Sequence, residues 1–109
     1  MSFVLDPPLL VASGAAIERL GPGENAARAL EAATLATFVG VSLALYADAP
    51  GLERIWRPFG SRSGREFMLT SGLAPVRERR IGAAQHLAAL SLFALYPLWI
   101  RLGRRAARR

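Results

Sequence analysis

The sequence predicts an all-α membrane protein in which two transmembrane helices form an antiparallel pair, joined by a long amphipathic loop and preceded by a short interfacial helix. Two observations lead to this prediction. Residues 81–100 include no formally charged residue, and a helix of that length spans about 30 Å, the thickness of the hydrocarbon core of a bilayer. Arginines stand directly before and after this segment, where they can reach the headgroups on either side. A shorter uncharged stretch, residues 32–47, supplies the second helix.

The composition narrows the classes of function. A chain of 109 residues holds one small domain. It contains no cysteine and a single histidine, His86, which excludes disulfides, cysteine nucleophiles and a multi-histidine metal site within the chain. The formal net charge is +6, and all fourteen basic residues are arginines. Because this charge lies beside apolar segments, we expect anionic lipid headgroups as its counterions and no nucleic acid partner.

The first predicted element is a short helix over residues 8–20. Proline is well tolerated in the first helical turn, so the two prolines that follow Asp6 can begin the helix, with Asp6 as its cap. The sequence Gly21-Pro22-Gly23 ends it. Its apolar part covers about 14 Å at helical rise, which is too short to cross a bilayer. We therefore expect this helix to lie at the membrane interface or packed on the other helices.

The first transmembrane helix is predicted over residues 28–48. Its uncharged core corresponds to about 24 Å of helix, and a snorkelling Arg28 extends the reach of this core toward the surface. Asp48 and Pro50 end the helix. A buried helix in a soluble bundle is the alternative, but such a helix requires more partner surface than the chain provides.

Small residues predict how the two long helices meet, because helices in lipid associate through close packing rather than through hydrophobicity. Residues four apart lie on one face of a helix, and both helices carry small residues at about this spacing. We expect these two faces to pack together in the antiparallel pair: Ala36, Gly40 and Ala44 from the first helix, and Ala84, Ala88 and Ser91 from the second.

Residues 49–80 form a connection that is too long for a tight hairpin and too patterned for a passive linker. Four apolar residues between Leu52 and Phe59 fall on one face of a short helix. A second apolar patch, residues 67–69, follows a polar glycine-rich stretch. Aromatic rings and guanidiniums suit the headgroup layer. We therefore expect an interfacial loop that contacts lipid headgroups or a partner through Arg54, Trp56, Arg57, Phe59, Arg62 and Arg65.

The second transmembrane helix is predicted over residues 81–101, followed by an arginine-rich tail at 102–109. Pro97 lies inside this helix, removes one backbone hydrogen bond and predicts a kink near Phe93. At the far end, the residues expected to contact lipid headgroups or a partner are Trp99, Arg101, Arg104 and Arg105.

Two ionisable residues lie near or within membrane depth, and both point away from the predicted helix pair. A neutral imidazole at His86 can ligate haem or a chlorophyll-type pigment. The arrangement Gly82-x-x-x-His86-x-x-x-Leu90 resembles the small-xxx-His-xxx-Leu pattern of light-harvesting polypeptides over nine residues, without the hydrophobic and aromatic surroundings of that family. The interpretation we favour is a neutral histidine hydrogen-bonded to a neighbouring helix. For Glu31 we favour an intrahelical pair with Arg28 over a transporter carboxylate. Because either group is costly against lipid, a partner is implied.

These patterns lead to a functional hypothesis. No Ser/His/Asp set, carboxylate pair or metal-ligand spacing occurs, so we expect no enzyme, no metal and no cofactor. The chain is predicted to be a non-catalytic accessory subunit of a larger integral-membrane complex, with a respiratory or photosynthetic complex as a natural host and other membrane subunits as partners. The alternatives are a haem- or chlorophyll-binding membrane protein ligated by His86, and a small self-oligomerising channel- or transporter-like protein. The dense C-terminal arginines favour two spans with both termini in the cytoplasm, in the inner membrane if the source is bacterial.

Overall fold

The computed structural model of the chain describes residues 3, 5–70 and 80–109. Within these residues all regular structure is helical, as the sequence predicts. The part of the predicted loop at 71–79 lies outside the described residues. The elements, in chain order, are α1 (Asp6–Leu20), α2 (Glu24–Tyr46), α3 (Glu53–Trp56), η1 (Arg57–Phe59), α4 (Gly64–Thr70), α5 (Ala83–Ser91), η3 (Leu92–Leu95) and α6 (Tyr96–Arg108).

Helix α1 begins and ends where the sequence signals stand, with one correction. Prolines occupy its first turn, and Gly21 ends it in the left-handed conformation with a φ of 64°, a geometry that glycine adopts without strain. Asp6, expected to cap the helix, is its first residue, and no side-chain cap is present. The carboxylate of Asp6 is instead buried and accepts a hydrogen bond from Tyr96 of α6. Asp6 is thus bonded to Tyr96, a residue of another helix, instead of capping its own helix.

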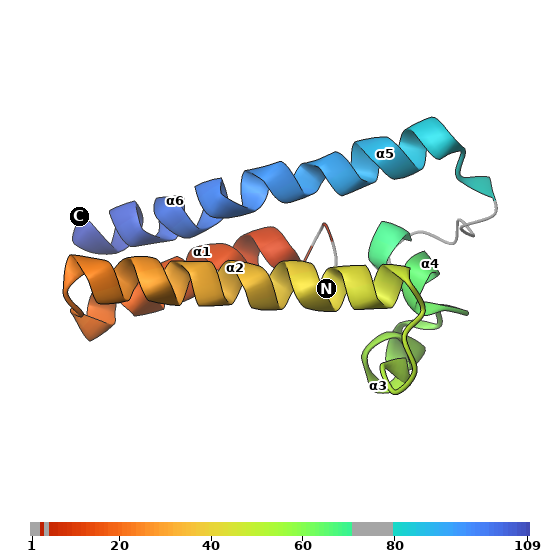
Figure 1. The fold of residues 1–109 in the computed structure, drawn as a ribbon, viewed down its shortest axis with the longest axis horizontal. Coiled ribbons are helices and arrows are strands. Elements are labelled where there is room, and N and C mark those ends of the chain that lie inside the picture. The colour runs from red at the N-terminus through yellow and green to blue at the C-terminus, as the bar shows by residue number, and fades with distance from the viewer. Residues whose placement is uncertain (1–2, 4, 71–79) are drawn as a thin grey trace.

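Three helices run alongside one another. Figure 1 shows α2 and the α5–α6 segment extending along the molecule in opposite directions, with α1 beside them. The closest approach is between α1 and α6. A methyl group added at Gly14 would overlap the backbone carbonyl of Ile100, and one added at Gly103 would overlap the carbonyl of Val11. Helix α1 therefore packs on the other helices, and two glycines that the sequence analysis did not select allow this contact.

The second predicted span is interrupted. Helix α5 ends at Ser91, a 3-10 turn covers Leu92–Leu95, and α6 begins at Tyr96. Pro97 lies in the first turn of α6 and has no N–H to donate to the preceding turn. The interruption therefore falls at the residues where a kink is expected. By length and composition, both α2 and the segment Ala83–Arg108 are long and apolar enough to cross a membrane.

The predicted arginine-rich tail at 102–109 is not a tail, because α6 continues to Arg108. Two of its arginines form ion pairs with glutamates of α1 and α2, and these contacts hold the last turns of α6 against the other helices.

The buried apolar residues form two clusters. In the first, Leu10 of α1 meets Tyr96 and Ile100 of α6, with Phe38 of α2 packed against them. In the second, Leu45 of α2 meets Phe67 and Met68 of α4. The predicted loop is thus folded onto the end of α2, and the apolar stripe of its short helix packs on this second cluster through Leu52, Ile55 and Trp56.

The contact between α1 and α6 can be tested with a matched pair of glycine substitutions. We expect Gly14→Ala to lower the free energy of unfolding by about 1–3 kcal/mol, because the added methyl group forces two backbones apart. Gly40→Ala is the control, since nothing lies within 4 Å of a methyl group there. It should leave stability unchanged or raise it by about 0.5–1 kcal/mol through reduced backbone entropy. Thermal unfolding in mild detergent, followed by circular dichroism, measures both. Equal effects of the two substitutions would contradict the close approach of α1 and α6.

Candidate functional site

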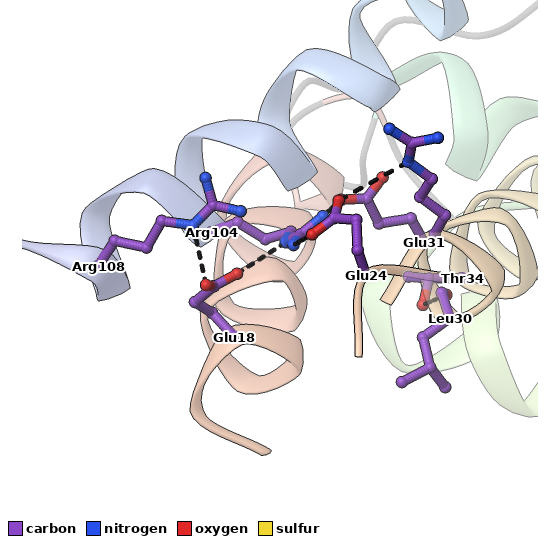
Figure 2. Close-up of polar contacts among 8 residues, drawn as sticks. Glu18, Glu24, Leu30, Glu31, Thr34, Arg104 and Arg108 are labelled. Carbon is purple, nitrogen blue, oxygen red and sulfur yellow. Dashed lines mark hydrogen bonds and ion pairs between the residues drawn. The ribbon is translucent and has the colours of Figure 1, made fainter. Parts of the chain in front are cut away.

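A cleft with a volume of about 510 Å³ lies between the first turns of α2 and the last turns of α6. Its four α6 arginines fall at i, i+3, i+4 and i+7, the spacing of a single helix face. We call this feature the charged cleft, and it is lined by Arg28, Arg101, Arg104, Arg105, Arg108, Glu24 and Glu31. Figure 2 shows the ion pairs along it.

Arg104 is the centre of these ion pairs. Its side chain is only 9% exposed, and its guanidinium reaches carboxylates on two other helices. Nε donates to Oε2 of Glu18 on α1 at 2.8 Å, and the two terminal nitrogens donate to Glu31 and, at 3.4 Å, to Glu24 on α2. The neighbouring residue, Gly103, is the point at which α6 approaches α1 most closely. The close backbone packing therefore brings Arg104 within reach of Glu18.

This arrangement corrects the prediction that Arg104 contacts lipid headgroups or a partner. A buried guanidinium loses its hydration, and several hydrogen-bonded carboxylates are needed to offset that cost. Three glutamates supply them here, from the chain itself. The sequence could have indicated that α6 forms ion pairs through this face. Its arginines recur at helical spacing near the C-terminus, and acidic residues of opposite charge stand near the start of α2.

The partner of Glu31 also differs from the expectation. Glu31 pairs with Arg104, while Arg28 lies 3.7 Å from Glu24 one turn away on an exposed surface. The charge of Glu31 is thus compensated within the chain, and it no longer implies an external partner. Arg101 and Arg105, for which contact with lipid headgroups or a partner stays a prediction, are exposed. In the described ranges, no carboxylate lies within ion-pair distance of either.

A second polar group is buried where the three helices meet. Oδ2 of Asp6 accepts a hydrogen bond from the hydroxyl of Tyr96 at 2.6 Å and one from Ser42 at 3.5 Å. All three side chains are almost completely buried. Sequence reasoning missed Ser42 and Tyr96, since nothing local marks them as partners of a residue near the start of the chain. The bonds cross from α1 to α2 and α6, and they fix how the three helices sit against one another.

His86 contacts a neighbouring helix, the arrangement favoured from the sequence. Its Nδ1 lies 2.8 Å from the hydroxyl of Tyr46 on α2, and the two rings meet edge-on. Arg65 stacks over the ring of Tyr46 and donates from Nε to its backbone carbonyl at 2.7 Å. The described residues hold no group of three His, Cys, Asp or Glu side chains placed to bind a metal. Ligation of haem or a chlorophyll-type pigment by His86 stays a prediction.

The structure does not bring the two predicted helix-packing faces together. Ala36 and Gly40 are exposed on α2, and Ala44 is half-buried. Ala84, Ala88 and Ser91 are all exposed on α5. The close packing occurs between α1 and α6 instead. There, Gly14 and Gly103 lie so near a backbone carbonyl of the other helix that neither position has room for a side chain.

The residues predicted to contact headgroups or a partner divide into two groups. Exposed arginines project from the segment between α2 and α4, namely Arg54, Arg57 and Arg62. The other residues are engaged within the chain: Trp56 and Trp99 pack against the two buried clusters, and the ring of Phe59 lies 4.9 Å from that of Phe67. Arg65 is held on Tyr46.

The chain matches no protein-family model, and no curated protein or solved structure shows significant similarity to it. Function is therefore inferred from the charged cleft and from the surface of the two long helices.

Removing the guanidinium at the centre of the cleft should destabilise the fold. In Arg104→Gln, the partly buried carboxylate of Glu31 loses its partner and that of Glu18 keeps only Arg108. We expect a loss on the order of 3 kcal/mol in the free energy of unfolding. Arg105→Gln is the matched control, since this neighbouring arginine is exposed, and we expect a change within about 0.5 kcal/mol. Chemical unfolding in mild detergent provides the comparison, and equal stabilities would show that Arg104 does not hold the helices together.

The pH dependence of stability follows from Glu18. Hydrogen bonds from Arg108 and Arg104 lower the pKa of Glu18 below its usual value of 4.5. Because the folded-state pKa is lower than the unfolded one, the stabilisation is complete above about pH 4.5 and is lost as the pH falls through the folded-state pKa. We expect the wild-type chain to lose more stability between neutral and acidic pH than Glu18→Gln. Glu53→Gln, which changes a carboxylate outside the cleft, should follow the wild-type profile. Parallel profiles for all three proteins would contradict this role.

Proposed function

We propose that the protein is a non-catalytic accessory subunit of a larger integral-membrane complex, with α2 and the α5–α6 segment crossing the bilayer as an antiparallel pair. The observation that carries this proposal is the exposure of the two long helices. Only 11% of the most apolar window of each is buried within the chain. A core helix of a soluble protein is mostly buried, so these surfaces need lipid or other helices to cover them.

The distribution of polar groups supports a lipid environment. Charged residues within a bilayer face the interior of a bundle and pair there. Asp6 and Glu31 follow this rule, since both bond to α6 inside the three-helix packing. Leucines cover the outside, each at least 40% exposed: Leu30, Leu43, Leu87, Leu92, Leu95 and Leu98. The chain therefore places polar contacts among its internal ones and exposes leucines along its long helices, a pattern expected in lipid.

The small-residue faces support a structural role toward other subunits. Ala36 and Gly40 on α2, and Ala84 and Ala88 on α5, point outward and leave room for another helix to approach closely. The exposed arginines between α2 and α4 suit anionic headgroups or acidic partner residues at the membrane surface.

A second copy of the chain is the second candidate occupant of the same α2 face, because Gly40 permits self-association by the same close packing. The protein is then a self-assembling membrane protein rather than an accessory subunit.

Affinity purification in mild detergent separates these functions, with mass spectrometry of the eluate, its absorption spectrum and carbonate extraction of the membranes beforehand. We expect the chain to remain in carbonate-washed membranes and to co-purify with unrelated subunits in fixed ratio. Gly40→Leu should release those subunits, while Gly40→Ala, which keeps the residue small, should retain them.

Other outcomes point elsewhere. A homo-oligomer that Gly40→Leu disrupts supports self-assembly. A coloured protein without other subunits, whose colour is lost in His86→Ala, supports cofactor binding. Release of the chain by carbonate contradicts membrane integration.

A further inference from the structure

The charged cleft holds more positive charge than its own carboxylates compensate. Arg104 and Arg108 are engaged with glutamates, and Arg28 makes one exposed contact. Arg101 and Arg105 line the same cleft, and across the described part of the chain neither has a carboxylate within ion-pair distance. The guanidiniums of Arg101 and Arg105 are therefore uncompensated on the α6 wall of the cleft. The ion pairs of Arg104 and Arg108 beside them fix the shape of the cleft.

We propose that the charged cleft binds a phosphate-bearing anion, held by Arg101 and Arg105 on α6 with Arg28 on the facing α2. A guanidinium presents parallel N–H donors that match two phosphate oxygens at once. Arg104 is already committed to three glutamates, so it shapes the floor of the cleft and does not contact the ligand.

The size of the cleft and its acidic residues define the class of ligand further. A volume of about 510 Å³ falls among sites that hold whole small molecules, about 300–1,000 Å³, and exceeds what one phosphate group fills. Glu24 and Glu31 lie on the α2 wall. A carboxylate repels a second phosphate and accepts hydrogen bonds from hydroxyls. The cleft therefore suits a ligand with a single phosphate group that also carries hydroxyl groups, such as a glycerol-type phospholipid headgroup.

The position of the cleft connects it to the membrane, and in this respect the inference rests on the proposed function. Arg101 directly follows the uncharged segment 81–100, and the cleft opens where α2 begins and α6 ends. In a two-span arrangement these ends lie together at one surface of the bilayer, at the level of the lipid phosphates. The same chemistry also fits a free phosphate compound from solution, so the test distinguishes the two sources.

Binding can be measured on the full-length chain in neutral detergent by titration with short-chain phosphatidylglycerol, phosphatidylcholine and glycerol 3-phosphate. The variant Arg101→Gln/Arg105→Gln removes the two unpaired guanidiniums. Arg19→Gln/Arg109→Gln is the matched control, since it removes the same charge from exposed arginines that do not line the cleft. A third variant, Arg101→Lys/Arg105→Lys, keeps the charge and removes the forked donors. Unfolding curves should coincide for all four proteins, because the substituted side chains are exposed.

We expect the wild-type chain and the Arg19/Arg109 control to bind phosphatidylglycerol and not phosphatidylcholine. The Arg101→Gln/Arg105→Gln variant should bind at least about tenfold more weakly, the effect of losing one charged hydrogen bond, with the lysine variant between them. Glycerol 3-phosphate bound with the same dependence on Arg101 and Arg105, without binding of phosphatidylglycerol, supports the anion site and assigns its ligand to solution.

Absence of binding by either phosphate probe, or equal weakening by the cleft and control variants, overturns the proposal. Carbonate extraction and co-purification do not depend on the cleft. A chain that stays in the membrane with its partner subunits and binds no phosphate therefore refutes only this inference, and a chain that binds phosphate but is released by carbonate refutes only the membrane role.

Discussion

The ion cluster around Arg104 is the constraint on which the rest of the structure depends. A guanidinium from α6 is shared by carboxylates of α1 and α2, so a single side chain sets the positions of three helices. Such a group is tolerated away from water only when its partners hold it on several sides. This requirement explains the glycines beside it, because Gly14 and Gly103 let α1 and α6 approach until Glu18 can reach Arg104. At the other end of α1, the bonds of Asp6 to Tyr96 and Ser42 fix the same three helices a second time.

The chain thus joins its helices by buried polar contacts as well as by its two apolar clusters, and it leaves much apolar surface outside. In water the opposite arrangement is favoured, because burial of apolar surface drives folding. In lipid there is little hydrophobic force between helices, and close packing with internal hydrogen bonds takes its place. Glycine contacts and buried ion pairs are the interactions that remain effective there. The long helices, largely unburied within the chain, are consistent with this environment.

The sequence predicted most of the helices and little of their packing. Gly21 and Pro97 are local signals, and they marked the end of α1 and the interruption before α6. The uncharged runs located the two long helices but not their ends, since α2 begins at Glu24 and α6 continues to Arg108. The partners of Asp6 and Arg104 lie far away in the chain, and no local pattern specifies them. Small residues are frequent in this alanine-rich sequence, so spacing alone could not distinguish the face at Gly40 from the contact at Gly14. The arginines of α6 looked alike in sequence, and only tertiary packing separates the buried Arg104 from its exposed neighbours.

The difference between the buried Arg104 and its exposed neighbours connects the charged cleft with the arrangement of the three helices. Arg104 holds α6 against α1 and α2, and Arg101 and Arg105 extend from the same helix face into the cleft. An anion bound between Arg105 and Arg28 connects α6 to α2 without breaking any internal ion pair, so binding strengthens a contact that already exists. A ligand that binds only the assembled form stabilises it, and the stabilisation grows with the logarithm of the ligand concentration above the dissociation constant. Under the proposed binding of a headgroup, the anion favours the arrangement in which α2 presents Ala36 and Gly40 outward, and we expect lipid composition at one membrane surface to influence how readily the chain packs against other helices.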